Sequence, residues 1–241
     1  LALARAIGHM LAVMRTAHSP FAAAPLLITL LAALAVPEVA SAADIKRRGG
    51  QAEGTFGASL CIPGKGECKS ADTVSGKTGP SFGMGLLIGF RPIRSLLIGG
   101  AYNLGFFNPD YRVGGDDLYK SAYQNSLFAV IRGILPIWRM DLGLEVAPGW
   151  SRQTFRARDT SVLNPISKTY SQGFALKLAP VVDFFITRRF FIGAKVDFIF
   201  NFHKQTCVED MGGSRVCGEA SDYKQASVHQ MLVGFHLGST F

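Results

Sequence analysis

The sequence predicts an all-β protein: a closed antiparallel up-and-down transmembrane β-barrel of about eight strands. Three observations support this prediction. Eight segments alternate between an apolar face and a face of small or polar residues. The connections between these segments alternate between short and long. The composition is also rich in glycine and phenylalanine and poor in charge.

The composition favours strands over helices. Charged residues make up 17% of the 241 residues and hydrophobic residues 48%, whereas a typical soluble domain is about one-quarter charged. Outside the N-terminal region, no apolar run is long enough for a helix that crosses a membrane, and the 27 glycines and 18 phenylalanines suit closely packed strands. The length allows one substantial domain. The net charge of +8, without a Lys/Arg stripe, indicates a surface that faces anionic lipid and not nucleic acid.

The first residues have the features of a targeting segment. Arg15 precedes the apolar stretch "FAAAPLLITLLAALAV", and residues 40–42 form an A-x-A cleavage site. We therefore expect residues 1–42 to be a cleaved signal peptide, residues 43–51 a short periplasmic lead and residues 52–241 the barrel. An uncleaved anchor is the alternative.

The strand signal is an alternation with period two. In "SFGMGLLIGF", residues 81–90, large apolar side chains alternate mostly with glycine and serine, as expected for a strand with two different faces. Stronger or weaker copies occupy residues 52–61, 96–107, 123–135, 140–150, 173–186, 190–203 and 228–241. Pro148 and Pro180 fall inside two of these segments and predict bulges or locally broken hydrogen-bond ladders.

The connections alternate in length. Short ones are expected at residues 91–95, 136–139 and 187–189, and long ones at residues 62–80, 108–122, 151–171 and 204–227. This is the layout of an outer-membrane barrel, which has short periplasmic turns and long extracellular loops. Extra pairing in the long fourth loop or before the first strand would raise the strand number to ten.

A soluble barrel with the apolar face inside is the alternative fold. The second face is mostly glycine, alanine, serine and asparagine, which is too poor in charge for a water-exposed surface but suits the narrow interior of an eight-stranded barrel. With the apolar face outside, aromatic residues collect at both rims, as membrane interfaces favour. The loop-end set is Phe106, Tyr123, Trp150, Phe174 and Phe202, and the turn-end set is Phe90, Phe184, Phe190 and Phe241.

The chain ends on "VGFHLGSTF", in which Phe241 is preceded at spaced positions by Leu237, Phe235 and Val233. Together with the strand number and the alternating connections, this segment resembles the outer-membrane barrel proteins of the OmpA and OmpX type. The resemblance implies that Phe241, Leu237 and Phe235 are read by the outer-membrane assembly machinery. We expect a monomer in the outer membrane of a Gram-negative cell, in contact with membrane lipid and lipopolysaccharide. The pattern says nothing specific about activity.

Alternation places a set of charged side chains on the inner face of the barrel. They are Arg132, Asp141, Glu145, Lys177, Asp183, Lys195 and Asp197. Hairpin pairing predicts that Arg132 lies near Asp141 and Glu145. It also predicts that Lys177 lies near Asp197, and that Asp183 lies near Lys195. We expect a salt-bridge network that fills the lumen, because unpaired buried charges are very costly; a gate for small solutes is the alternative.

No catalytic site is indicated. His203 and His229 lie near the loop end with Ser227 and Asp222, and such a set at the outer rim would suit a lipid A-modifying deacylase or acyltransferase. No compact motif supports it, and a rim histidine bonded to a loop or headgroup is the simpler interpretation. We therefore expect no enzyme, cofactor or metal, with lipid A modification as the alternative function. His236 points inward and is expected to fill the lumen.

The cysteines predict disulfides, because the protein is expected to be exported. They are Cys61, Cys68, Cys207 and Cys217. The local pairs, Cys61 with Cys68 and Cys207 with Cys217, would staple the first and last long loops. Cross-loop pairs stay open, since these loops are neighbours in a closed barrel. No histidine cluster accompanies the cysteines to suggest a metal.

The third long loop is basic. Arg152, Arg156, Arg158 and Lys168 stand against Asp159, and arginine matches the geometry of phosphate. The base of this loop is expected either to reach lipopolysaccharide phosphates or to carry ordinary solvated charge. The sequence thus predicts a structural or surface-interaction role: envelope integrity, adhesion or ligand contact through the loops.

Overall fold

A computed structural model describes residues 45–62, 75–113, 116–117, 119–158, 166–219 and 229–241. The long strands are β1 (Gly49–Cys61), β3 (Ser81–Ile93), β4 (Leu96–Val113), β6 (Tyr119–Ile137), β7 (Met140–Ala157), β8 (Ile166–Phe185), β9 (Phe190–Asp210) and β11 (Gln230–Thr240). Short strands are β2 (Ser75–Gly79), β5 (Asp116–Asp117) and β10 (Arg215–Glu219). No helix within the described ranges is long and apolar enough to cross a membrane.

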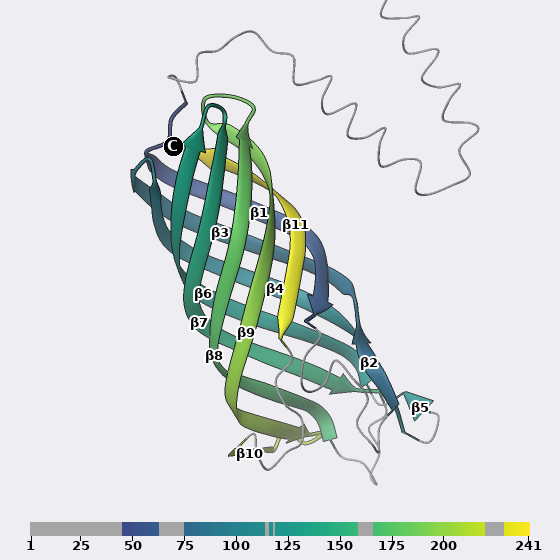
Figure 1. The fold of residues 1–241 in the computed structure, drawn as a ribbon. Coiled ribbons are helices and arrows are strands. Elements are labelled where there is room, and N and C mark those ends of the chain that lie inside the picture. The colour runs from purple at the N-terminus through teal and green to yellow at the C-terminus, as the bar shows by residue number, and fades with distance from the viewer. Residues whose placement is uncertain (1–44, 63–74, 114–115, 118, 159–165, 220–228) are drawn as a thin grey trace, which may run out of the picture. The chain divides into compact units, whose positions relative to one another are not determined.

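The eight long strands close into an antiparallel ring (Figure 1). Each long strand pairs with the next long strand along the chain, and the ring closes where β1 pairs with β11. The closing register runs from Gln51 opposite Thr240 to Cys61 opposite Gln230. Pairing of sequence neighbours is the up-and-down topology. The predicted fold class and strand number are therefore confirmed.

Several strands run further than the sequence predicts. β4 ends at Val113, β7 at Ala157 and β9 at Asp210, six or seven residues beyond the expected ends. β1 begins at Gly49, three residues before the expected start of the barrel. The extensions carry the short strands, because β2 and β5 pair with β4 and β10 pairs with β9. Outside the bilayer a strand needs no apolar face, so the hydrophobic alternation does not mark these segments.

The two faces of the barrel wall are inverted relative to a soluble protein. Outward-facing apolar side chains are widely exposed, with Leu86 at 62%, Leu144 at 60% and Phe235 at 78%. The inward-facing side chains of Arg132 and Lys177 are 0% exposed. Charged residues are almost never fully buried unless they are paired. An apolar band outside and a polar filling inside identify the wall of a membrane barrel.

Pro148 and Pro180 interrupt the hydrogen-bond ladder without moving the strands. The β6–β7 pairing lapses beside Pro148 and the β8–β9 pairing lapses beside Pro180, with the same register on either side of each gap. Proline has no backbone N–H to donate to a ladder. The prediction of locally broken ladders is confirmed at both positions. The two register shifts in β8–β9 lie elsewhere, between Ile166 and Lys168 and between Gln172 and Gly173, and the second leaves Lys204 without an opposite residue.

Glycines let the two closing strands approach each other. Gly57 on β1 lies opposite Gly234 on β11. A Cβ atom added at Gly57 would lie 2.0 Å from the carbonyl oxygen of Val233, and one added at Gly234 would lie 2.5 Å from that of Phe56. A side chain at either position would therefore push the seam apart.

Candidate functional site

Arg132 joins several strands at the centre of the lumen. From β6 its guanidinium donates to both carboxylate oxygens of Glu53 on β1, at 2.6 and 2.8 Å. It also donates to Glu145 on β7 at 2.9 and 3.1 Å, and Asp183 on β8 lies 3.8 Å away. These four side chains are at most 3% exposed. Buried charges are tolerated only with such pairing and hydrogen bonding.

Lys177 and Lys195 continue the network on β8 and β9. The Lys177 Nζ atom lies 2.5 Å from Glu145 and 4.0 Å from Asp197. Lys195 lies 3.7 Å from Asp197, which also accepts a hydrogen bond of 2.9 Å from the side-chain amide of Asn103 on β4. The chain of charges thus spans the lumen from one wall to the other.

Two polar side chains complete the network near Arg132. The Nε2 atom of His236 on β11 lies 2.5 Å from a carboxylate oxygen of Asp183. The amide of Gln51 donates to Glu53 at 2.6 Å. His236 is 1% exposed and Gln51 is 0% exposed, so both fill space that water would otherwise occupy.

A second cluster closes the turn end of the lumen. Asp141 on β7 accepts hydrogen bonds from Arg91 on β3 at 2.8 Å and from Arg47, which precedes β1, at 2.9 Å. Arg47 also donates to the carbonyl of Trp138, and Arg91 donates to that of Arg94 at 2.6 Å. Arg91 is 0% and Asp141 is 1% exposed. Both cations therefore depend on protein partners and not on water.

Most of the buried charges are paired with opposite charges. The cations that face carboxylates are Arg47, Arg91, Arg132, Lys177 and Lys195, and the carboxylates are Glu53, Asp141, Glu145, Asp183 and Asp197. Arg139, which is 7% exposed, is a further buried cation and donates to the backbone carbonyls of Phe185 and Ile186. A filling of paired charges suits the narrow interior of an eight-stranded barrel.

The charged residues singled out from the sequence all lie in these two clusters, but two predicted contacts are wrong. Arg132 contacts Glu145 as expected, whereas Asp141 is bound by Arg91 and Arg47 and not by Arg132. The expectation followed pairing along one hairpin. The observed contacts of Asp141 instead cross to other strands, because long arginine side chains reach over the narrow lumen.

The predicted contact of Asp183 with Lys195 is also wrong. Asp183 lies against His236 and Arg132, while Lys195 faces Asp197 on its own strand. The register places Asp183 opposite Gly193, and Lys195 lies two residues further along, opposite Val181.

Sequence reasoning did not single out Glu53, Arg91 and Arg47. Alternation carries a signal for the first two, since Glu53 lies between outward positions in β1 and Arg91 follows the outward-facing Phe90. Arg47 precedes the first strand, where no alternation exists to mark it.

His203 lies between two serines at the loop end of the lumen. Its Nε2 atom is 2.7 Å from the Ser151 hydroxyl and its Nδ1 atom is 2.8 Å from the Ser171 hydroxyl. Ser151 donates to Asn201 at 2.6 Å, and Asn201 donates to Gln124 at 3.0 Å. Ser151 is 0% exposed, and no carboxylate of the described chain contacts His203. Among the described residues, the arrangement is a polar plug in which serine hydroxyls contact both ring nitrogens of His203.

The other members of the expected histidine set are placed differently. Ser227 and Asp222 lie outside the described residues. His229 accepts a hydrogen bond of 3.1 Å from the backbone N–H of Asn201, so its ring is held against β9. Among the residues that the structure describes, no group of three or more His, Cys, Asp or Glu side chains is placed to hold a metal ion.

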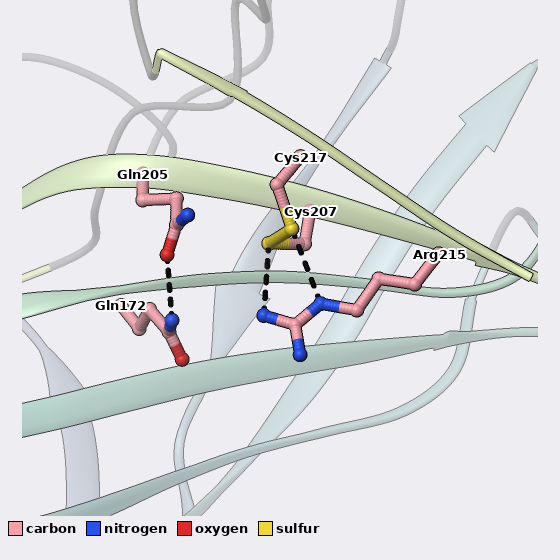
Figure 2. Close-up of a disulfide and its surroundings, with 5 residues drawn as sticks. All are labelled: Gln172, Gln205, Cys207, Arg215 and Cys217. Atoms are coloured by element: carbon pink, nitrogen blue, oxygen red, sulfur yellow. Dashed lines mark hydrogen bonds between the residues drawn. A yellow bond between two sulfur atoms is a disulfide. The ribbon is translucent and has the colours of Figure 1, made fainter.

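Cys207 and Cys217 form a disulfide directly across the β9–β10 pair, with Cα atoms 4.1 Å apart. This is the local pairing for the last long loop. Cys61 is also disulfide-bonded, and Cys68 lies outside the described residues. Figure 2 shows Arg215 beside the bridge, donating to the sulfur of Cys217 at 3.1 Å and to that of Cys207 at 3.5 Å.

An aromatic row marks the loop-end rim of the outer face. Trp150, Phe174 and Phe202 lie opposite one another on β7, β8 and β9 and are 44%, 53% and 52% exposed. The last two rings stack with centroids 6.0 Å apart. At the turn end, Phe90 and Phe190 are 58% and 60% exposed. The apolar band thus ends in aromatic side chains at both rims, as bilayer interfaces favour.

The basic residues expected in the third long loop lie largely on paired strands. Arg152 and Arg156 belong to β7 and Lys168 to β8. Lys168 forms an ion pair of 2.6 Å with Glu209 on β9. Asp159 lies outside the described residues. The basic residues at the base of this loop therefore belong to the paired strands of the barrel wall.

Comparisons with known proteins identify the fold. No protein-family model matches the chain, and no curated protein matches it in sequence. Among solved structures, the chain is similar to a major outer membrane protein from Thermus thermophilus, with a TM-score of 0.54 and 11% identity over 80% of this chain and 99% of that one. It is also similar to the outer membrane protein OprG from Pseudomonas aeruginosa, with a TM-score of 0.51 and 12% identity over 81% of this chain and 98% of that one.

At these identities the likeness shows the fold alone. It agrees with the closed eight-membered ring, the exposed apolar band and the two aromatic rims. The chain therefore has the fold of the eight-stranded outer-membrane β-barrel proteins.

Proposed function

We propose that the protein is a non-channel component of the outer membrane with a structural or surface-contact role: envelope integrity, adhesion or ligand contact at the loop end. The filled lumen carries this proposal. Arg132, Glu145 and Lys177 meet at its centre with 0% exposure, and the Asp141 cluster closes the turn end. An eight-stranded barrel packed in this way leaves no aqueous path.

The length of the strands supports a contact role at the loop end. Strands β6, β7, β8 and β9 have 19, 18, 20 and 21 residues, whereas about 9–11 residues cross a bilayer. A paired wall therefore continues beyond the membrane, and the Cys207–Cys217 disulfide ties β10 to it. A rigid extension presents a surface to a partner at low entropic cost.

Conductance tests the filled lumen. The full chain is reconstituted in planar lipid bilayers, with a wide porin as the positive control and with the gel-mobility difference between unboiled and boiled samples as the check of folding. We expect no discrete conductance steps above the bare membrane. Steps from the folded protein would overturn the proposal and favour a gate for small solutes.

The proposed role needs no catalytic step. The Ser151 hydroxyl that contacts His203 is buried inside the lumen, where an acyl chain of lipid A has no access. Mass spectrometry of lipid A from cells with and without the protein tests the alternative function. We expect identical acylation, and a gained or lost acyl chain would replace the contact role with lipid A modification.

We also propose that the last strand supplies the assembly signal and that the folded protein is a monomer. Phe235, Leu237 and Phe241 are 78%, 61% and 59% exposed, so none of them fills the lumen, and each can serve as a signal before the barrel inserts into lipid. Replacing Phe241 with serine is expected to reduce the heat-modifiable protein made in cells and to leave refolding in detergent unchanged. Unchanged assembly in cells would contradict the signal, and light scattering in detergent checks the monomer.

A further inference from the structure

We propose that the outer wall at the loop end binds phosphate groups of the lipopolysaccharide headgroup. The site is built from Arg152, Arg156 and Arg215, which rest on the rings of Tyr123 and Tyr170. This inference rests on the proposed orientation, with the loop end outside the cell, and it names a partner for that surface. It is independent of whether the lumen conducts ions.

Three rows of outward-facing residues rise above the aromatic row of the loop-end rim. In order of height they are Arg152–Gln172–Gln205, then Thr154–Tyr170–Cys207–Cys217, then Arg156–Lys168–Glu209–Arg215. Figure 2 shows part of this surface, including the 2.7 Å hydrogen bond between Gln172 and Gln205. Outward residues of one strand are about 6.6 Å apart, and strands of such barrels tilt by about 35–45°. The rows therefore lie roughly 5 to 15 Å above the rim, from the headgroup layer outward.

Two guanidinium groups stack on the same ring. The Cζ atom of Arg152 lies 3.7 Å from the centroid of Tyr170, and that of Arg215 lies 5.1 Å from it. Tyr170 is 1% exposed although it lies on the outer face. In the same way, Arg156 lies over Tyr123 at 5.7 Å. Stacking fixes the plane of a guanidinium and leaves its N–H groups to donate within that plane. In Arg215, Nε and Nη2 donate to the disulfide, and the remaining N–H groups are left for other acceptors.

Within the described ranges, no carboxylate forms an ion pair with Arg152, Arg156 or Arg215. The nearest acidic side chain of the rows, Glu209, is engaged by Lys168. The Nε atom of Arg152 is buried without a hydrogen-bond partner. Two cations held against one ring repel each other, so an anion bound beside them would stabilise the arrangement.

The disulfide sets the position of Arg215. It joins β10 to β9 in the row of Tyr170, and Arg215 donates to both of its sulfur atoms (Figure 2). Arg215 thereby reaches Tyr170 from the strand beyond β9. Removing the disulfide should release β10 and weaken binding.

Phosphate fits this site better than other anions. A planar guanidinium donates two parallel hydrogen bonds to a phosphate, and Arg152 and Arg156 on β7 together with Arg215 on β10 offer donors of this kind. The site lies on the lipid-facing side of the wall, directly above the aromatic row. This position favours a membrane glycolipid over a soluble anion, and we assign it to lipopolysaccharide.

The test compares lipid A with and without its phosphates. The full chain, purified in a neutral detergent, is titrated with each lipid, and bound lipid is counted by native mass spectrometry. We expect wild type to bind phosphorylated lipid A at least tenfold more tightly than dephosphorylated lipid A. Arg152→Gln with Arg215→Gln should abolish this preference. The matched control, Arg94→Gln with Arg189→Gln, removes two exposed arginines at the turn end and should bind as wild type does.

Several outcomes would overturn the site. These are equal affinity for both lipids, an equal loss in the turn-end control, and binding of inorganic phosphate without binding of lipid A. Only protein whose gel mobility changes on boiling is compared, so that misfolded protein does not affect the measured affinities. A second pair, Arg152→Lys with Arg215→Lys, keeps the charge and removes the planar stack, and should lose several-fold in affinity. Failure of this test leaves the conductance result, and hence the filled-lumen proposal, unaffected.

Discussion

Arg132 on β6 and Glu53 on β1 form a two-pronged ion pair through the lumen, at 2.6 and 2.8 Å, between strands that are not neighbours in the sheet. Both side chains are 0% exposed. Hydrogen-bond ladders tie each strand only to the next one. This pair braces the wall from inside, and it brings Glu145 and Asp183 into the same contact.

Replacing Arg132 with methionine is expected to lower the free energy of unfolding by about 3–5 kcal/mol, because it leaves buried carboxylates without their partner. Urea unfolding of the barrel in lipid vesicles, followed by tryptophan fluorescence, measures the change. The exposed Arg94→Met is the matched control and should stay within about 0.5 kcal/mol of wild type. Adding Glu53→Gln to Arg132→Met should recover part of the loss. A loss of less than about 1 kcal/mol for Arg132→Met would contradict a bracing role.

Gly57→Ala is expected to hinder closure of the barrel. The new Cβ atom would lie 2.0 Å from the Val233 carbonyl oxygen across the seam, and overpacking of this kind costs about 1–3 kcal/mol. The fraction of refolded protein with heat-modifiable mobility measures closure. Gly54→Ala lies on the same strand, and its Cβ atom would meet only Phe56 at 3.9 Å. That control should close as wild type does, and equal yields from both variants would show that the seam tolerates side chains.

The sequence predicts the parts of the strands that lie within the bilayer better than the parts that extend beyond it. Within the membrane, alternation separates outward residues such as Leu144 from inward ones such as Glu145, because lipid demands one face and the lumen the other. Beyond the aromatic row both faces meet water, and the extensions of β7 and β9 carry no such signal. The sequence therefore predicts the ring and its strand number but ends the strands too early.

The site is less predictable for a different reason. Alternation states which charges face inward, but the partner of each charge depends on how far a side chain reaches across the lumen. Arg91 reaches Asp141 over 50 positions of sequence, which no hairpin rule foresees. The stack of Arg152 and Arg215 on Tyr170 likewise depends on β10, a strand inside the long fourth loop, where the sequence leaves extra pairing open without locating it.

Phe235→Arg tests the lipid-facing band. Phe235 is 78% exposed near the middle of β11, and an arginine at the bilayer midplane on the lipid face costs about 2–4 kcal/mol. The free energy of unfolding in lipid vesicles is the measurement. Ile166→Arg is the control, since Ile166 is 39% exposed at the loop end of β8 and should change stability by less than about 0.5 kcal/mol. Equal changes in the free energy of unfolding at the two positions would mean that both side chains face the same environment. That result would contradict the inference that Phe235 faces lipid and Ile166 lies outside the bilayer.

Opening the Cys207–Cys217 disulfide should make β10 sensitive to protease while the barrel stays resistant. The bond ties β10 to β9, and the pairing that remains covers five positions, Arg215 to Glu219, which is marginal for an edge strand in water. Trypsin added to intact vesicles is expected to cut after Arg215 at least several-fold faster in Cys207→Ser with Cys217→Ser than in wild type. Arg156 lies on β7, which is paired with both β6 and β8. Cleavage after Arg156 should therefore stay slow in both proteins, and faster cleavage there would indicate a general loss of structure. If β10 is cut equally fast with and without the bond, its ladder alone holds it. Arg215 would then keep its place over Tyr170 in the reduced protein as well.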